Sequence, residues 1–426
     1  MHDVDVIVIG AGAAGIAAAR RLVVTTRLSV RLLEARDRVG GRAWTLDAAG
    51  FPLDLGCGWL HSAEHNEWSA IAQEVGFEID PTPPPWSRRA HEAGFPLAEQ
   101  DDFAAAWSRF QARVAEAGRA AADRPASELL EPGGRWNPLL DALSSYINGV
   151  ELDRLSVADF VNYRDSGINW RVVSGYGRLI EAYARGLDVT LNCPVTRIDH
   201  SGGMIRVITP RGVVKTRAVI LAIPPTVIAS EALRFVPALP QKLAAAHALP
   251  LGLADKVFLR VDDPRDLPTA ARLFGATDRV ATGSYHLRPF GRPLIEGYFG
   301  GRLAEELEHA GESGFAAFAI DQIAKQLGAD IRKRLHPLAA SAWRRDPFAG
   351  GSYSYAKVGH SDARGALAAA VDGRLFFAGE ACSRHDFSTA HGAYRTGVQA
   401  ADDAARALSA YSGELGTGSP TRICAT

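Results

Sequence analysis

The stretch VIVIGAGAAGIAAARRLVVTTRLSVRLLEARDRVGGRAW, from Val6 to Trp44, decides the fold of this chain. It starts inside an apolar run, Val4 to Ile9, whose β-branched residues predict a strand buried on both faces of a parallel sheet. A glycine-rich turn, an alanine-rich helix to about Leu22 and a second strand from Ser29 to Leu33 follow. This order predicts a Rossmann-like α/β domain.

The turn has the spacing Gly-x-Gly-x-x-Gly, which a strand must precede and a helix must follow to be informative. Gly10 allows the tight turn, Gly12 lets backbone approach a pyrophosphate at the helix N-terminus, and Gly15 lets helix and strand pack closely. Glu34 follows about 20 residues later and can accept from ribose hydroxyls. We therefore expect a bound dinucleotide here.

A second glycine pair, Gly40-Gly41, comes directly before Arg42. The pair permits another close backbone approach, and a guanidinium can reach a phosphate or the edge of a flavin. A plain nicotinamide dehydrogenase does not need this second loop. The sequence has one Gly-x-Gly-x-x-Gly, which favours a flavin reduced by the substrate itself over one reduced by NADPH bound in a second domain.

Composition narrows the class of protein. The chain has 426 residues, 47% of them apolar, and a net charge of −1, so we expect no nucleic-acid partner. The four cysteines are far apart, which argues against a disulfide framework and a metal site. No apolar run reaches the roughly 18–20 residues of a membrane span. With a strand beginning near the first residue, we expect no signal peptide, no membrane contact and a cytoplasmic location.

Six further stretches carry a resemblance, and they occur in a fixed order along the chain. They are DLGCGWLHSAEHN (54–66), NWRVVSGYGRLIEAYARGLDVTLNCPVTRID (169–199), TRAVILAIPPTVI (216–228), GLADKVFLRV (252–261), WRRDPFAGGSYSY (343–355) and LFFAGEACSRHDFSTAHGAYRTGVQAADDAARAL (375–408). With the opening loop, they resemble the flavin-containing amine oxidase family: monoamine oxidases, polyamine oxidases and flavoenzymes like the lysine-specific demethylase. The chain is similar to a bacterial-type, single-chain member.

The resemblance implies FAD as the cofactor. Val195 would contact the adenine through its backbone, Glu380 would accept from ribityl hydroxyls, and the last helix, starting near Ser388 or Thr389, would direct its N-terminal dipole at the flavin. Ser352 falls where animal monoamine oxidases carry the cysteine bonded to flavin, so the FAD is expected to be noncovalent. The expected cofactor-binding residues are Gly10, Gly12, Ala14, Gly15, Glu34, Ala35, Arg36, Gly40, Gly41, Arg42, Gly58, Trp59, Val195, Gly379, Glu380, Thr389 and Ala390.

Four residues are candidates for catalysis. Lys256, in an apolar strand, would lie near flavin N5 through a bridging water, although a lysine there can also snorkel to the surface. Tyr353 would form one wall of the family's aromatic sandwich. Thr389 stands where monoamine oxidases carry the second tyrosine, so the sandwich would be half-open, as in polyamine oxidases and the lysine-specific demethylase. His61 resembles a pocket histidine, with a structural role equally open.

Five other side chains each have two candidate roles. Trp343 and Tyr355 could line the pocket or pack in the core. Glu64, Glu67 and Asp165 could supply negative charge for a distal ammonium group, but the pattern favours a solvated surface acid for each of them.

The resemblance also predicts two discontinuous domains. Segments 1–76, 175–249 and 346–411 would form the FAD-binding domain, and 77–174 with 250–345 an α+β substrate domain of the kind found in amine oxidases and p-hydroxybenzoate hydroxylase. Residues 412–426, rich in Gly, Ser and Thr, are predicted to be disordered.

The expected activity is oxidation of a primary or secondary amine, or a polyamine. A hydride would pass from the α-carbon to flavin N5, the imine would hydrolyse to a carbonyl and an amine or ammonia, and oxygen would be reduced to hydrogen peroxide. Two alternatives stay open: an L-amino-acid oxidase or desaturase of the same fold, and a non-catalytic FAD-holding scaffold that binds partners. The sequence leaves open which amine is used, and whether the protein is a monomer or a homodimer.

Overall fold

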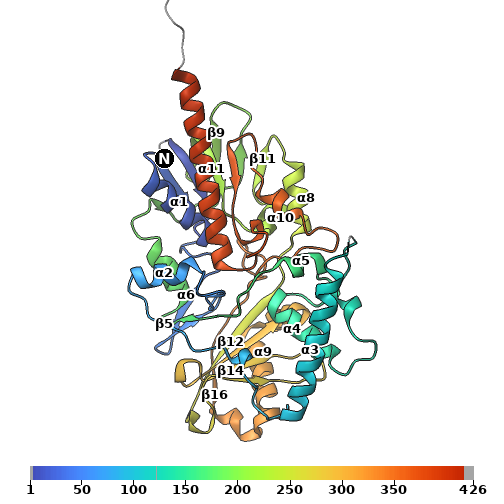
Figure 1. The fold of residues 1–426 in the computed structure, drawn as a ribbon. Helices are drawn as coiled ribbons and strands as arrows, with labels where there is room; N and C mark the ends of the chain where they lie inside the picture. The colour runs from blue at the N-terminus through green and yellow to red at the C-terminus, as the bar shows by residue number, and fades with distance from the viewer. Residues whose placement is uncertain (1–2, 121, 417–426) are drawn as a thin grey trace, which may run out of the picture.

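The computed structural model describes residues 3–120 and 122–416, which form two lobes, each built on a β-sheet (Figure 1). The upper lobe in Figure 1 contains β1 (Val4–Ile9) and the long helix α11 (Ala390–Gly416). The lower lobe contains β12 (Ala254–Val261), β14 (Ser284–Leu287) and α9 (Gly301–Leu327). Segments from both ends of the chain thus meet in the upper lobe.

The upper sheet has eight strands within the described residues, and its centre is parallel. β1 pairs in parallel with β2 on one side and β10 on the other, while β10 also pairs in parallel with β17. In order across the sheet the strands are β11 (Arg234–Val236), β8 (Arg197–Asp199), β9 (Ile205–Thr209), β10 (Gly212–Leu221), β1, β2 (Val30–Leu33) and β7 (Val189–Thr190), with β17 (Leu375–Phe377) also on β10.

Helices cover both faces of this sheet, as the continuous apolar strands require. Along β1, Val6 and Val8 pack on one face and Ile7 and Ile9 on the other. The first face carries α1 (Ala13–Thr25), α2 (Glu67–Glu74), α6 (Tyr176–Tyr183) and α11. The second carries α7 (Pro225–Ala229), α8 (Pro240–Ala248) and α10 (Ala363–Ala368).

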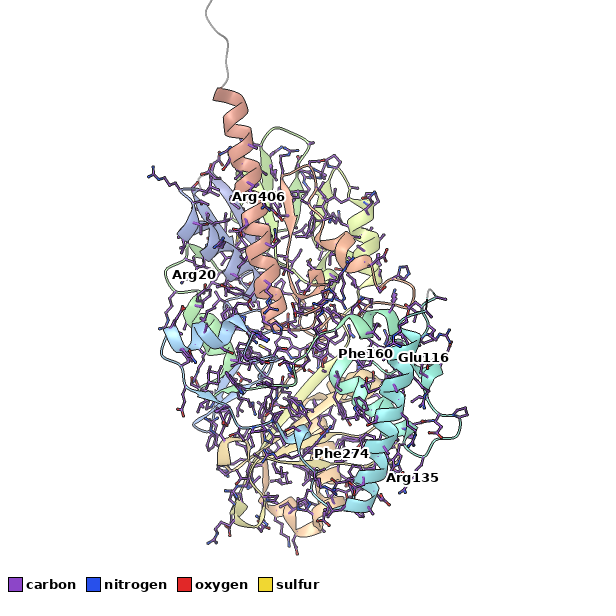
Figure 2. The ribbon with its side chains drawn as sticks, in the orientation of Figure 1. Arg20, Glu116, Arg135, Phe160, Phe274 and Arg406 are labelled. Carbon is purple, nitrogen blue, oxygen red and sulfur yellow. The ribbon has the colours of Figure 1, made fainter. Side chains whose placement is uncertain are left out.

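Helices α1 and α11 lie side by side over the first face (Figure 1). A Cβ on Gly397 of α11 would lie 2.1 Å from the carbonyl oxygen of Ala14, so glycine is what lets the two helices approach here. In Figure 2, Arg20 of α1 and Arg406 of α11 mark this pair in the upper lobe.

The lower sheet has five antiparallel strands within the described residues. Their order is β13 (Ala271–Phe274), β14, β15 (Leu294–Gly300), β12 and β16 (Leu335–Ala340). One face packs on α9 through alternate residues such as Val257, Leu273 and Tyr285. The other face is turned away from α9. Beside it, α4 (Asn137–Asn148) contacts β12 and β15, and α3 (Leu97–Ala117) shares a hydrophobic cluster with Phe274 of β13. Helix α5 (Val157–Asn162) packs against α3.

Short elements complete the described chain. Two further antiparallel pairs are the hairpin of β3 (Thr45–Ala48) with β4 (Phe51–Asp54), and the long-range pair of β5 (Ile79–Asp80) with β6 (Arg171–Val172). The short 3-10 helices are η1 (Pro85–Ser87), η2 (Ala126–Leu129), η3 (Pro264–Asp266), η4 (Pro289–Gly291), η5 (Ala329–Arg334) and η6 (Glu380–Cys382). No helix among the described residues is long and apolar enough to cross a membrane.

The end of the chain corrects one expectation. Disorder was predicted from residue 412 onward, but α11 continues to Gly416. The helix passes the expected boundary because the first proline of the tail is Pro420, and Gly413 inside the helix costs only about 1 kcal/mol relative to alanine. The rest of the predicted tail, 417–426, lies outside the described residues.

Candidate active site

A single large cavity, of about 1180 Å³, joins the two lobes. Its lining includes the glycine turn of the upper lobe. It also includes side chains on the face of the lower sheet that is turned away from α9, which we call the open face. Such a volume exceeds the usual range for one small ligand, and fits a dinucleotide with a substrate chamber beside it.

The glycine turn has the geometry that a pyrophosphate site needs. Gly10 has a φ of +97°, and a Cβ on Gly15 would lie 1.8 Å from the carbonyl oxygen of Gly10. By contrast, a Cβ on Gly12 would meet nothing closer than 3.9 Å, and Gly12 lines the cavity. Helix α1 starts at Ala13 without a side-chain cap, so its first N–H groups are left for an anion.

Glu34 lies at the carboxyl end of β2, beside this turn. Its Oε2 accepts from the Ala11 N–H at 2.7 Å and its Oε1 from the Arg36 N–H at 2.9 Å. The Arg36 guanidinium is held in turn by both carboxylate oxygens of Asp346, each at 2.8 Å. The two backbone contacts fix the Glu34 carboxylate beside the glycine turn, and its role toward a ribose stays a prediction.

Arg42 and Glu380 form an ion pair that joins the second glycine loop to η6. Arg42 Nη1 lies 2.8 Å from Glu380 Oε1 and donates to the Ser352 carbonyl at 2.7 Å. Burial raises the pKa of Glu380, but Arg42 and the hydroxyl of Ser354 lower it by more, so the net pKa lies below its usual value. Glu380 is therefore a fixed acceptor in the cavity wall.

Thr389 caps helix α11 rather than pointing freely into the chamber. Its Oγ1 donates to the Asp386 carbonyl at 2.6 Å and accepts from the Gly392 N–H at 3.0 Å. Helix α11 begins at Ala390, one residue after the predicted start. Thr389 and Ala390 still line the cavity, so the helix N-terminus faces it as expected.

Lys256 belongs to a buried charge cluster on the open face of the lower sheet. Its Nζ donates to the Asp54 carbonyl at 2.9 Å and lies 3.0 Å from Glu296 Oε1. The other oxygen of Glu296 accepts from Arg171 Nη1 at 2.9 Å. Lys256 is 8% exposed and lines the cavity beside Gly58, where a Cβ would lie 3.2 Å from Nζ.

The cluster keeps Glu296 ionised. Burial raises the pKa of Glu296, but Arg171 and then Lys256 outweigh it, so the pKa falls far below the usual value. The Arg171 guanidinium also lies 5.0 Å from the ring centroid of Trp59, another cavity residue. One carboxylate is thus shared by two cations at the wall of the chamber.

Tyr353 and His61 line the cavity from two different segments. Tyr353 Oη donates to the Tyr146 carbonyl at 2.5 Å, which fixes its ring. His61 Nδ1 lies 2.6 Å from Asn169 Oδ1, and burial lowers the pKa of His61. His61 is therefore a neutral, oriented imidazole in the structure, and its role stays a prediction.

Ser352 is occupied by the lower sheet. Its Oγ donates to the Ala254 carbonyl and accepts from the Ala254 N–H, both at 2.8 Å. Of the cysteines lining the cavity, Cys57 has a pKa raised to about 12, by burial first and by Asp54 second. A thiol with that pKa is not a thiolate nucleophile at neutral pH.

The cavity gathers nearly all the predicted residues. Those that line it are Gly10, Gly12, Ala14, Glu34, Ala35, Arg36, Gly40, Gly41, Arg42, Gly58, Trp59, His61, Val195, Lys256, Tyr353, Gly379, Glu380, Thr389 and Ala390. Gly15 lies behind the turn, in its expected packing role.

The five side chains with two candidate roles lie partly in the cavity wall and partly elsewhere in the molecule. Trp343 and Asp165 line the cavity, whereas Glu64 and Glu67 do not. Tyr355 packs in the core, with its hydroxyl 2.6 Å from Arg154 Nη2, so it is not a pocket residue.

Sequence reasoning missed Glu296, Arg171 and His286. Glu296 and His286 are charged or polar residues inside otherwise apolar strands, the same signal that identified Lys256. Within the described residues, no group of three His, Cys, Asp or Glu side chains could hold a metal ion.

The residues fit FAD on structural grounds. One cavity contains three features of an FAD site: Gly12 at the uncapped start of α1, the fixed carboxylate of Glu34 at the end of β2, and the N-terminus of α11. The fold and this cavity define a flavin-dependent oxidoreductase.

Comparisons with known proteins give the family. Residues 13–405 match the family described as "Flavin containing amine oxidoreductase". "Polyamine oxidase 3" from Oryza sativa subsp. japonica is 30% identical, over 94% of this chain and 89% of that protein. Human "Lysine-specific histone demethylase 2" is 27% identical, over 94% of this chain and 53% of that protein.

The fold comparison agrees. A structure of putrescine oxidase bound to putrescine has a TM-score of 0.76 at 20% identity, covering 95% of this chain and 99% of that one. The chain belongs to the flavin-containing amine oxidoreductase family. Its cofactor is FAD, and it is an FAD-dependent amine oxidase.

Proposed function

We propose that this enzyme oxidises a primary or secondary amine, using oxygen as the acceptor. When bound, FAD supplies a hydride acceptor at N5 and a route for electrons to oxygen, which leaves as hydrogen peroxide. The imine product then hydrolyses in water to a carbonyl compound and an amine or ammonia. The protein's task is to bind the neutral amine, orient it and exclude water.

One observation carries this proposal: the nucleotide-binding turn and a chamber lined by aromatic rings belong to one continuous cavity. Tyr353, Trp59 and Tyr298 line it together with Lys256. Such rings give an apolar, water-poor surface, in which an amine loses its proton more readily than in water.

The residue roles follow from the positions of the groups. Lys256, held between Asp54 and Glu296, places a fixed positive charge where the two lobes meet. The N-terminus of α11 adds positive potential on the upper side of the cavity. Both features would stabilise negative charge that develops during the reaction.

The FAD is proposed to be noncovalent, because Ser352 is committed to Ala254 and the Cys57 thiol is protonated. We assign segments 1–76, 175–249 and 346–411 to the flavin-binding domain and 77–174 with 250–345 to the substrate domain. A cytoplasmic location and a monomeric or homodimeric state remain predictions.

The activity is tested by measuring oxygen uptake and peroxide release with putrescine, spermidine, benzylamine and several L-amino acids. Equal amounts of oxygen consumed and peroxide released with an amine would support the proposed amine oxidase. Turnover of amino acids alone would favour the alternative, an L-amino-acid oxidase. Acid precipitation should release all the flavin into solution, and flavin retained in the pellet would contradict noncovalent binding.

Lys256 has its own test. In Lys256→Met, we expect amines still to reduce the flavin under anaerobic conditions, while reaction of the reduced enzyme with oxygen slows by about 10-fold or more, because a fixed positive charge is lost. Stopped-flow absorbance separates the two half-reactions. Unchanged reaction with oxygen would remove Lys256 from the proposed chemistry.

A further inference from the structure

The open face of the lower sheet carries an ordered array of side chains. Strand pairing places Arg272 beside His286 and His286 beside Glu296, on β13, β14 and β15. In the adjacent row, Phe274 lies beside Ser284, Ser284 beside Tyr298, and Tyr298 beside Lys256. Residues directly opposite each other in adjacent strands point to the same face.

This array forms one wall of the cavity. Arg272, Phe274, Ser284, His286, Tyr298 and Lys256 all line it. Lys256 stands at one side of the array and Arg272 at the other, three strand spacings away, or roughly 14 Å between backbones. Phe274, labelled in the lower lobe in Figure 2, marks the Arg272 side.

Arg272 has no acidic partner among the described residues. Its Nε donates to Ser284 Oγ at 2.9 Å, and its guanidinium lies 4.2 Å from the ring centroid of Phe274. Burial lowers the pKa of Arg272 to about 10, so the side chain stays charged at neutral pH. With Nε engaged, the two terminal nitrogens form the remaining edge of the guanidinium, which matches a carboxylate.

His286 separates Arg272 from the carboxylate of Glu296. It is 4% exposed, and neither ring nitrogen has a hydrogen-bond partner. Burial, and then Arg171, lower the pKa of His286 to about 3, so the imidazole is neutral. A buried imidazole without a partner, in a cavity wall, is available to a polar ligand group.

Three of the five carboxylates that line the cavity are paired with arginines. Glu34, Asp101 and Glu380 pair with Arg36, Arg89 and Arg42 respectively, and Asp165 accepts from Ser62 and Gly167. The pKa of Asp255 is raised well above its usual value, by burial first and then by Glu308, and its Oδ1 accepts from the Ser341 hydroxyl at 2.7 Å. None of these carboxylates belongs to the array, so a second ammonium group at its far side would meet the Arg272 guanidinium and be repelled.

We propose that Arg272, with His286 beside it, binds a carboxylate carried by the amine substrate at a distance from the reacting nitrogen. The substrate is then an amino carboxylate with several carbon atoms between its two ends, rather than a diamine or an α-amino acid. This assignment rests on the proposed amine oxidation.

The test compares molecules that share one carbon chain. The kcat/KM of ε-aminocaproate should exceed that of hexylamine by about 10- to 100-fold, the usual value of a hydrogen bond to a charged group, and hexamethylenediamine should be the poorest. In Arg272→Met the preference for ε-aminocaproate over hexylamine should vanish, and Arg272→Lys should restore part of it. Arg265→Met is the matched control, because Arg265 is 87% exposed and does not line the cavity.

A binding measurement is independent of turnover. Caproate, which cannot be oxidised, should raise the unfolding temperature of the wild-type holoenzyme and perturb its flavin spectrum, but it should do neither in Arg272→Met. If Arg272→Met does not fold, caproate binding is compared between the wild type and Arg272→Lys. The flavin spectrum and the unfolding transition show that Arg272→Lys is folded.

Three results would contradict parts of this proposal. Preference for hexamethylenediamine, or no effect of Arg272 substitution on caproate binding, would overturn the carboxylate site. Preference for norleucine over ε-aminocaproate would overturn the separation between amine and carboxylate. If caproate binding depends on Arg272 but no amine reduces the flavin, the proposed oxidation fails and the anion site stands.

Discussion

The position of Lys256 depends on residues from other segments of the chain. Lys256 alone could be placed from the sequence, because a lysine in an apolar strand is unusual. Its partners are Glu296 on β15, which strand pairing places beside β12, and the carbonyl of Asp54 at the end of β4. Arg171 of β6 reaches the same carboxylate from another segment of the chain. The sequence therefore predicted the lysine but not the charge that holds it.

The shared carboxylate predicts an order of stability losses. In Glu296→Gln, two buried cations lose their common anion, so we expect a loss of roughly 3–5 kcal/mol in the free energy of unfolding. In Lys256→Met, Arg171 still pairs with Glu296, so the loss should be clearly smaller. Urea unfolding of both holoenzyme variants at neutral pH measures the order. The reverse order would contradict the proposed sharing.

His286 predicts a pH dependence. Its pKa is about 3 in the folded state and 6.5 for a free histidine, so the unfolded chain binds more protons between these values. Stability is therefore lost as the pH falls below about 6.5, by up to about 1.4 kcal/mol per pH unit from this group.

In His286→Asn this loss on acidification should be shallower than in the wild type. His360→Asn, at an exposed position, serves as the control. Urea unfolding at several pH values between 7 and 5 makes the comparison. Equal slopes in wild type and His286→Asn would show that His286 becomes protonated in the folded enzyme.

Among the elements, helix α11 combines packing with function. Its glycine at position 397 brings it against α1, and its N-terminus faces the cavity. The small residues of this helix were visible in the sequence, and so was its start to within a residue or two. The capping role of Thr389 was not, because the resemblance to monoamine oxidases, which carry a tyrosine at this place, suggested a pocket residue.

Replacing the cap should weaken this helix. Thr389→Ala removes the acceptor of the Gly392 N–H, and a lost cap costs about 1 kcal/mol. Thr389→Ser keeps the hydroxyl and should stay close to the wild type. Thermal and urea unfolding with flavin release as the signal measure the difference. Equal stability of the two variants would argue against the cap.

The lower sheet shows where local patterns stop being informative. Strands around Lys256–Arg260 and Leu294–Phe299 could be predicted from their apolar residues, and they lie within β12 and β15. The row from Arg272 to Glu296 could not, because it requires the register of three strands. A shift of one residue in that register would turn Arg272 away from the cavity.

At the scale of the whole molecule, function depends on a cavity that neither lobe makes alone. The upper lobe supplies the nucleotide turn, Glu34 and the start of α11, and the lower lobe supplies Lys256 and the array that ends at Arg272. The flavin side of this arrangement was predictable because its motif is local, within the first fifty residues. The substrate side was less so, because its residues are spread over several segments.

The most direct test of the central claim is anaerobic titration of the yellow holoenzyme with amines, followed by admission of air. The account predicts that an amine, with ε-aminocaproate favoured over hexylamine, removes the oxidised flavin absorbance, and that air restores it with release of hydrogen peroxide. A flavin that no member of an amine and amino carboxylate panel reduces would contradict the claim that this cavity oxidises amines.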